Sequence, residues 1–157
     1  MTFAQSFGKL DTNQMRIRTF DMGGHTFKVK VPLTCETEAL DRKLQTIDQE
    51  KVDEFYILLT KELLEKKSEY SAELGVEYLE NDIVIQGKSM REAARNKYLS
   101  EFRITEMFKY LVPEAGHSLD DLTYAEIDEL FPFSIQMELL NKISEIISPA
   151  YKASKGK

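Results

Sequence analysis

The sequence predicts an α+β fold that is mostly helical, with an N-terminal β-hairpin packed on a bundle of about four to five helices. Alternating apolar and polar residues flank a glycine-containing turn near the N-terminus. Apolar residues then recur at helical spacing over most of the chain that follows. The 157 residues are enough to bury a core as one domain without metals or disulfides.

The hairpin is expected within residues 14–31. The first strand runs over Met15–Phe20, the turn over Asp21–Gly24 and the second strand over His25–Val31, before Pro32. Glycine accepts a positive φ without steric cost, which favours a tight turn at the glycine pair.

One face of this hairpin is expected to be apolar. Phe27, Val29 and Val31 alternate with polar residues in the second strand, and Met15 and Ile17 alternate with arginines in the first. A two-stranded hairpin is marginal in water, so the apolar face needs a helix or another subunit against it.

The helices begin after Pro32. Thr34 is the predicted N-cap of the first, and the pattern continues to about residue 67, either as one helix or as two with a bend near 46–49. Residues 72–88 give the weakest signal, and 82–87 are open between a short strand, a buried loop and a helix connection. Ser89–Glu92 matches a capping box that opens a helix ending near Leu111.

The remaining pattern predicts two further helices. Thr123–Glu126 is a second capping box, and its short helix is broken at 131–133. A last helix then carries a wide apolar face and stops at Pro149. The predicted boundaries are a flexible arm over 1–13, one globular domain over 14–149 and a basic flexible tail over 150–157.

Composition excludes several function classes. The net charge is −6, which counts against a nucleic-acid partner, and no apolar run reaches the ~20 residues of a membrane span. The single cysteine, Cys35, and the absence of a signal-peptide pattern favour a cytoplasmic protein.

No residue pattern predicts an enzyme, a metal site or a cofactor site. Cys35, His25 and His117 are scattered, so Cys35 is expected to be a small first-turn residue and the histidines to lie at the surface. Gly87-Lys88-Ser89 resembles the end of a P-loop, but the position of the required first glycine is Asp82. Gly87 is therefore expected in a turn and Ser89 as a helix cap.

Charge is unevenly distributed along the second half of the chain. No lysine or arginine lies between Lys109 and Lys142, whereas residues 88–109 are rich in both. The intervening acids are Glu114, Asp120, Asp121, Glu126, Asp128, Glu129 and Glu138. The simpler interpretation is ion pairing between neighbouring helices; the alternative is complementary faces between subunits or toward a partner.

Exposed apolar surface is the remaining route to function. Aromatic and aliphatic residues around the last helix, which include Tyr151, are expected mainly to pack in the core, with a groove for a partner helix as the alternative. The candidate partner-binding residues are Phe27, Val29, Val31, Phe131, Phe133, Ile135 and Leu139.

The order of these parts resembles the tail assembly chaperones of long-tailed bacteriophages. The resemblance rests on the polar arm, on the hairpin that ends Gly-Gly-His-Thr-Phe-Lys-Val-Lys-Val-Pro-Leu, on the acidic helix entry at 34–38 and on the closing segment from 131 to 149. It implies a non-enzymatic protein of the host cytoplasm that binds the phage tape measure protein and keeps it soluble before the tail tube polymerises. It also implies contact with the tail tube protein. A longer form of the chain made by ribosomal frameshifting is implied as well, and the codons of the final Gly156-Lys157 could form the slippery heptamer that such a frameshift needs.

Other functions remain open at this point. The chain could be a structural tail or head-tail connector protein that stays in the virion, or a small enzyme or regulator with an unrecognised site. A homo-oligomer is also open, because the basic and acidic stretches suit a head-to-tail array.

Overall fold

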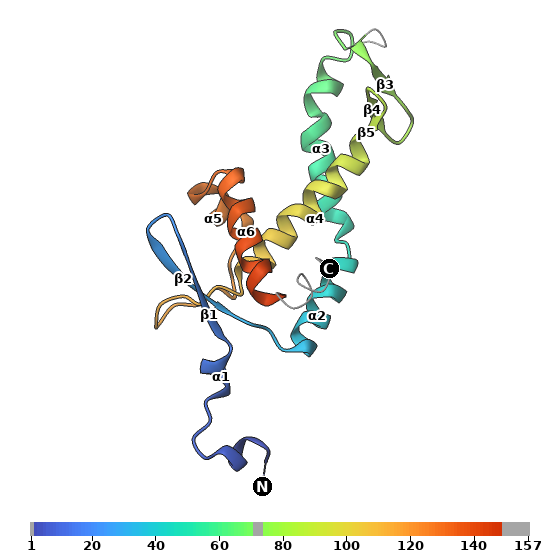
Figure 1. The fold of residues 1–157 in the computed structure, drawn as a ribbon. Coiled ribbons are helices and arrows are strands. Elements are labelled where there is room, and N and C mark those ends of the chain that lie inside the picture. Colours follow the sequence, from blue (N-terminus) through green and yellow to red (C-terminus); the bar gives the residue numbers. More distant parts are fainter. Residues whose placement is uncertain (1, 71–73, 149–157) are drawn as a thin grey trace, which may run out of the picture. The chain divides into compact units, whose positions relative to one another are not determined.

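The computed structural model describes residues 2–70 and 74–148. It confirms the α+β, mostly α fold with an N-terminal antiparallel hairpin. Figure 1 shows the elements in chain order. Their bounds are η1 Ala4–Phe7, α1 Thr12–Met15, β1 Ile17–Met22, β2 His25–Lys30, α2 Thr34–Gln45, α3 Gln49–Glu65, β3 Val76–Tyr78, β4 Ile83–Ile85, β5 Lys88–Ser89, α4 Met90–Phe108, α5 Tyr124–Leu130 and α6 Phe133–Ile147.

The chain forms two compact units. The first combines residues 1–41 with 104–157, and the second comprises 42–103. The first contains the hairpin, α5 and α6; the second contains α3 and the strands β3–β5. The predicted boundaries at 14 and 149 remain predictions, and the predicted tail over 150–157 lies outside the described residues.

The hairpin turn is tighter than the sequence analysis expected. β1 extends to Met22, so only Gly23 and Gly24 connect it to β2, with φ angles of 60° and 77°. Positive φ at both central residues is the signature of a type I′ turn, whose twist matches that of the strands. Met15 belongs to α1 instead, which Asp11 caps by accepting a hydrogen bond from the Gln14 N–H.

The faces of β1 are offset by one residue from the prediction. Phe20 pairs with Phe27, their rings stacked 5.2 Å apart, and Arg18 pairs with Val29. Paired residues share a face, so Phe20 and Met22 lie on the apolar side and Ile17 on the opposite one. The predicted apolar position of Ile17 is therefore wrong, whereas Phe27 and Val29 are apolar-facing as predicted.

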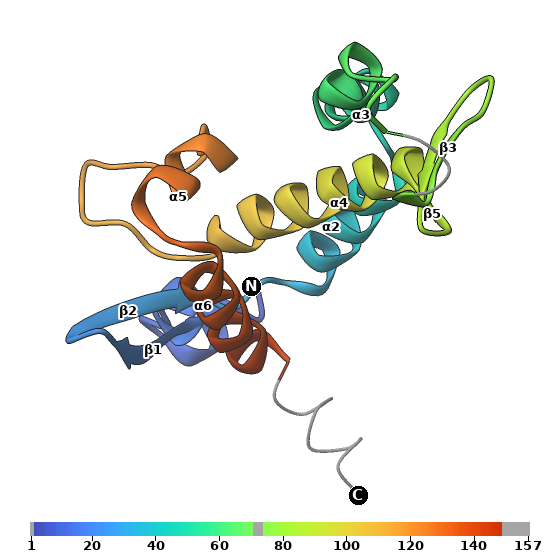
Figure 2. The same cartoon turned by 90° about the horizontal axis from the view of Figure 1, so that it is seen from above.

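The core of the first unit forms where α6 packs on β2, which lie together in Figures 1 and 2. Val29, Ile104, Leu139 and Ile143 are at most 1% exposed. Partly buried residues of β1 and β2 pack on the same cluster. The hairpin thus gains the helical support that an isolated pair of strands needs.

The end of α4 covers one edge of the hairpin. The helix stops at Phe108, before the predicted Leu111, because the next residues turn into an extended segment beside β2. The Lys30 N–H donates to the Tyr110 carbonyl (2.9 Å), and the Val112 N–H donates to the Lys28 carbonyl (2.8 Å). These bonds satisfy two of the outward backbone groups of β2, the Lys30 N–H and the Lys28 carbonyl.

The long helical pattern after Pro32 is two helices. α2 ends at Gln45 and α3 begins at Gln49, where Asp48 accepts a hydrogen bond from the Lys51 N–H. The bend predicted near 46–49 is therefore confirmed. At the start of α2, Glu36 rather than the predicted Thr34 supplies the cap: its side chain accepts a hydrogen bond from the Leu33 N–H (3.0 Å).

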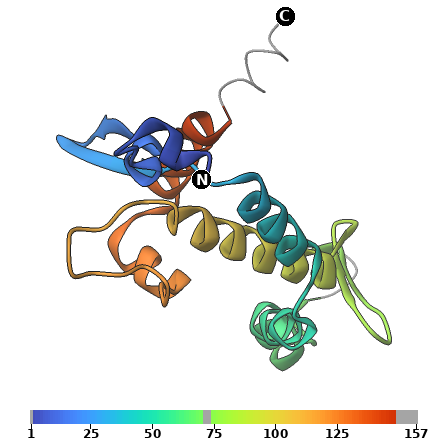
Figure 3. The ribbon, with the colours of Figure 1, turned by 90° about the horizontal axis from the view of Figure 1, so that it is seen from below.

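The second unit contains a sheet that the sequence left open. β3, β4 and β5 form an antiparallel sheet in that order, with Val76 opposite Ile85 and Val84 opposite Ser89. Figure 3 shows these strands in yellow-green beside the start of α4. Of the three alternatives for 82–87, the short strand is correct, so the chain after the hairpin is not purely helical.

Candidate partner-binding surfaces

The described residues contain no group of three or more His, Cys, Asp or Glu side chains that could hold a metal ion. Cys35 is exposed in the first turn of α2, and His25 and His117 are exposed, as the sequence predicted. The His25 ring packs edge-on against Phe27, with centroids 4.6 Å apart.

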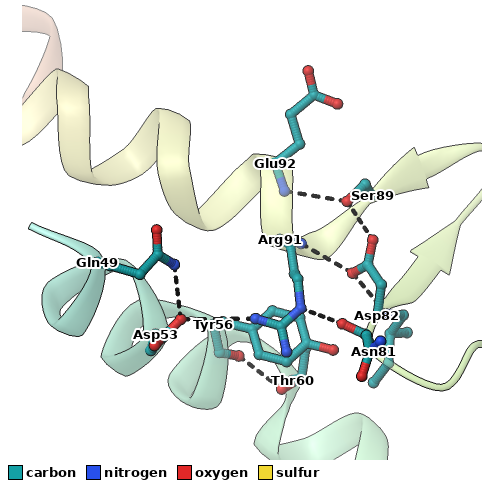
Figure 4. Close-up of polar contacts among 10 residues, drawn as sticks. Gln49, Asp53, Tyr56, Thr60, Asn81, Asp82, Ser89, Arg91 and Glu92 are labelled. Carbon is teal, nitrogen blue, oxygen red and sulfur yellow. Dashed lines mark hydrogen bonds and ion pairs between the residues drawn. The ribbon is translucent and has the colours of Figure 1, made fainter. Parts of the chain in front are cut away.

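The segment that resembles a P-loop is a structural corner closed by Asp82. Its carboxylate accepts hydrogen bonds from the Ser89 hydroxyl, the Ile83 N–H (2.8 Å) and the Arg91 N–H (3.1 Å) (Figure 4). Ser89 in turn caps α4 by accepting from the Glu92 N–H (3.2 Å). Gly87 sits in the turn with φ 80°. Both predictions, a turn at Gly87 and a cap at Ser89, are confirmed.

Arg91 joins this corner to α3. Its guanidinium stacks over the Tyr56 ring at 4.1 Å, donates through Nε to the Asn81 carbonyl and lies 3.8 Å from the Asp53 carboxylate (Figure 4). Burial raises the pKa of Tyr56. The cluster therefore holds α3, the small sheet and α4 together within the second unit, with its charges engaged by the protein itself.

A cleft of about 360 Å³ in the first unit is lined by charged residues from the hairpin and the loop after α4. Arg16 pairs with Glu36 at 2.5 Å and donates through Nε to the Val31 carbonyl (2.8 Å), and Lys109 pairs with Glu106 at 2.8 Å. Burial raises the pKa of Tyr110 at its wall. Two of the three lysine and arginine side chains in the lining are therefore paired with carboxylates of the protein itself, which weakens the attraction of the cleft for an anion.

The seven predicted partner-binding residues divide between core and surface. Val29 and Leu139 are 0% and 1% exposed, which leaves them no surface for a partner in this conformation. Phe27, Phe131 and Ile135 are partly buried against the same core, and Val31 is half-buried. Phe133 alone among them is a large exposed apolar residue, at 57%. Core packing thus accounts for most of this set, and its partner-binding role stays a prediction.

A buried glutamine explains why Phe133 points outward. Gln136 is fully buried; its Oε1 accepts from the Tyr124 hydroxyl (2.7 Å), and its Nε2 donates to the Phe131 carbonyl (2.8 Å) and to Asp128 (3.2 Å). These bonds fix the turn between α5, which is orange in Figure 2, and α6, which is red. The side chains at the outside of the turn are left in solvent.

Leu130 and Phe133 define this α5–α6 corner. Leu130 is 72% exposed, and Phe133 starts α6 three residues later. The preceding Ile127 is buried at 3%, because it lies on the inner face of the short helix. The sequence pattern included Leu130 in the apolar face of that helix, but exposure could not be deduced without the fixed angle of the turn.

A second apolar surface lies on α3. Ile57, Leu58 and Leu64 are all more than half exposed, whereas Val52 and Thr60 of the same helix are buried. α3 also carries charged side chains such as Glu54 and Lys61, so these exposed apolar residues lie among polar ones on the helix. The helical pattern of the sequence places Leu59 on the apolar stripe, yet Leu59 is 39% exposed, and the pattern does not predict the exposure of Ile57, Leu58 and Leu64.

The acids between Lys109 and Lys142 form no ion pair with lysine or arginine in the described part of their own unit. Asp128 accepts a hydrogen bond from Gln136, and Lys109 pairs with Glu106, which precedes the acidic stretch. Internal pairing within the unit, the simpler interpretation of the sequence, is therefore not found there. The acidic charge around α5 remains available to a partner.

The outer edge of β1 is open but protected. No further strand pairs with β1 in the described chain, and its edge carries the outward backbone groups of Ile17, Thr19 and Asp21. The Arg18 guanidinium donates to the carbonyls of Met15 (2.7 Å) and Ile17 (3.0 Å). It therefore places a positive charge on this edge and uses the outward Ile17 carbonyl, which another strand would need as an acceptor. Charged side chains on edge strands oppose uncontrolled pairing.

Comparisons of the chain with family models, with curated proteins and with solved structures found no match. Within the described residues, no helix is both long enough and apolar enough to cross a membrane.

Proposed function

We propose that this chain is a non-enzymatic tail assembly chaperone of a long-tailed bacteriophage. It binds the tape measure protein in the host cytoplasm and keeps it soluble until the tail tube polymerises. The proposal begins from the sequence resemblance, whose hairpin, helix entry and closing helix correspond to β1–β2, α2 and α6.

The observation that carries the proposal is exposed apolar surface on helices. Ile57, Leu58 and Leu64 on α3, and Leu130 and Phe133 at the α5–α6 corner, are each more than half exposed. Such side chains are what a protein that covers the apolar stretches of a helical client must present. Among the described residues, no group of three or more His, Cys, Asp or Glu side chains is placed to hold a metal ion.

The partners follow from this role. The tape measure protein is the client, the tail tube protein displaces the chaperone, and a frameshifted longer form of the chain works beside it. A homo-oligomer that repeats along the client is part of the proposal. Nucleic acid is not among the proposed partners, because the net charge of the chain is −6.

Co-expression with the tape measure protein tests the proposal. The tape measure protein should be insoluble alone, soluble with this chain, and recovered with it in a pull-down from infected cells. A Leu58→Ser and Phe133→Ser double variant should fold and lose the solubilising effect. A tape measure protein that remains insoluble, or that is absent from the pull-down, would contradict the proposal.

The alternative is a structural tail or head-tail connector protein, since exposed apolar side chains also suit a permanent neighbour in a particle. Mass spectrometry of purified virions separates the two. A chaperone is absent from the virion, whereas a structural protein is present at a fixed copy number. The frameshifted form is tested by sequencing the gene, which should contain a slippery heptamer near its end and an overlapping reading frame.

A further inference from the structure

We infer that the α5–α6 corner, defined by Leu130 and Phe133, binds an amphipathic helix whose apolar stripe is flanked by lysine and arginine. This deepens the proposed function and rests on it only for the natural identity of the partner. The inference itself depends on the exposure, the rigidity and the charge of the corner.

Exposure gives the corner its apolar contact. Leu130 and Phe133 are 72% and 57% exposed and stand on either side of Pro132, which fixes the backbone between them. Two large exposed apolar side chains three residues apart, on either side of a fixed turn, offer a small apolar anchor for a partner helix.

Rigidity keeps the anchor in place before a partner arrives. Gln136 is bonded to α5 through Tyr124 and Asp128 and to the turn through the Phe131 carbonyl. Phe131 also packs edge-on against Phe108, with ring centroids 6.5 Å apart, and so ties the turn to the core. A pre-ordered surface loses less conformational entropy on binding.

Charge specifies the occupant. Glu126 lies one helical turn before Leu130 on the same face of α5, and Glu129 is its neighbour; both are exposed. Neither pairs with a cation in the described chain, and no lysine or arginine occurs from 110 to 141. An acidic surround repels nucleic acid, anionic membranes and acidic helices, and it attracts a helix with basic flanks.

The test uses the full chain and synthetic helical peptides of about 18 residues with one common leucine stripe. One peptide carries lysine and arginine on the flanks of the stripe, the second carries glutamate there, and the third is a scramble of the basic one. Fluorescence anisotropy at low and at physiological salt gives the affinities. The basic peptide should bind, more tightly at low salt, and the other two should not.

Matched variants locate the contact. Leu130→Ser with Phe133→Ser should weaken binding of the basic peptide about fivefold to thirtyfold. Leu58→Ser on α3, which removes an equally exposed leucine from the other unit, should leave it unchanged. Glu126→Lys with Glu129→Lys should abolish binding of the basic peptide and allow the acidic peptide to bind, whereas Glu65→Lys on α3 should do neither. Circular dichroism confirms that each variant is folded.

Several results would overturn the inference: equal binding of basic and acidic peptides, no binding of either, or binding that survives the corner variant. Failure of the inference and failure of the proposed function are distinguishable. If the corner variant still solubilises the tape measure protein, the inference is wrong and the proposed function stands. If the basic peptide binds at the corner but the tape measure protein does not bind the chain, the inference stands and the proposed function is wrong.

Discussion

The hydroxyl of Tyr124 donates a hydrogen bond to Oε1 of Gln136 over 2.7 Å, which joins α5 to α6 across the turn that exposes Leu130 and Phe133. Gln136 is fully buried and uses both ends of its amide, because Nε2 donates to the Phe131 carbonyl and to Asp128. A buried amide with all these bonds fixes one geometry, whereas an apolar residue there would allow several.

Replacing Gln136 is expected to destabilise the first unit strongly. Gln136→Leu leaves the Phe131 carbonyl and the Tyr124 hydroxyl without their partner, which should cost about 1–3 kcal/mol of unfolding free energy. Tyr124→Phe removes one bond and should cost about 0.5–1.5 kcal/mol. Urea unfolding followed by circular dichroism measures both. The exposed Gln45→Leu is the control and should change stability by less than about 0.5 kcal/mol.

The hairpin turn gives a second prediction, because Gly23 and Gly24 both have positive φ. Gly24→Val places a β-branched side chain in the left-handed region and should cost about 1–2 kcal/mol or more. Gly23→Asn should be nearly neutral, since Asn-Gly is a favoured type I′ pair. Thermal unfolding should therefore separate the two variants clearly. Equal losses of stability would mean that the turn does not have this geometry in solution.

These turns and caps were largely predictable from the sequence. The glycine pair, the capping boxes at Ser89 and Thr123 and the break near 46–49 all depend on a few adjacent residues. Local hydrogen bonds and φ preferences are encoded within a turn or so of the chain, and so they appear in a short window of sequence.

The parts that were missed depend on contacts between distant residues. Arg18 and Ile17 were assigned to the wrong faces because Met15 fits an alternating pattern equally well, and only the pairing of Phe20 with Phe27 fixes the register. The exposure of Phe133 depends in the same way on the buried amide of Gln136. The periodicity of a helix indicates an apolar face but not which of its edge residues the tertiary structure covers.

The corner at Asp82 predicts a dependence of stability on pH. Burial alone would raise the pKa of Asp82, but hydrogen bonds from Ser89 and from the N–H groups of Arg91 and Ile83, with the Arg91 charge, hold it below its usual value. A pKa lowered by folding means that the unfolded carboxyl takes up its proton first as pH falls. The stabilisation is thus complete above the unfolded pKa of about 3.9 and is lost as pH falls through the folded pKa.

Urea midpoints measured from about pH 6 to about pH 2 test this. Asp82→Asn should lower the midpoint of the second unit near neutrality, and the difference from the unmodified chain should shrink toward the acidic end. Asp120→Asn, at an exposed loop position of the first unit, is the matched control. Its urea midpoint should change with pH in the same way as that of the unmodified chain. A difference at Asp82 that stays constant with pH would exclude the charged carboxylate as its cause.

Arg18 is expected to limit association through the open edge of β1. Its guanidinium donates a hydrogen bond to the Ile17 carbonyl and places a positive charge on the strand that carries Phe20. Arg18→Thr removes both obstacles, so light scattering should show association that rises with protein concentration. Lys28→Thr is the control, because the outer edge of β2 is already bonded to Tyr110 and Val112. If both variants stay as dispersed as the unmodified chain, the arginine is not what protects the edge.

The last prediction separates the core residues from the surface residues among the seven candidates for partner binding. Leu139→Ala should destabilise the first unit by about 2–5 kcal/mol, because Leu139 is 1% exposed and its removal leaves a cavity. Phe133→Ala should change stability by less than about 0.5 kcal/mol and yet reduce recovery of the tape measure protein in pull-downs. Equilibrium unfolding and pull-downs below the melting temperature of both variants measure the two effects independently. A Leu139 variant that keeps its stability, or a Phe133 variant that loses it, would contradict the assignment of these residues.

Because Val29 and Leu139 have no free surface, any loss of binding in their variants must follow their loss of stability, whereas Phe133 can act on the partner directly.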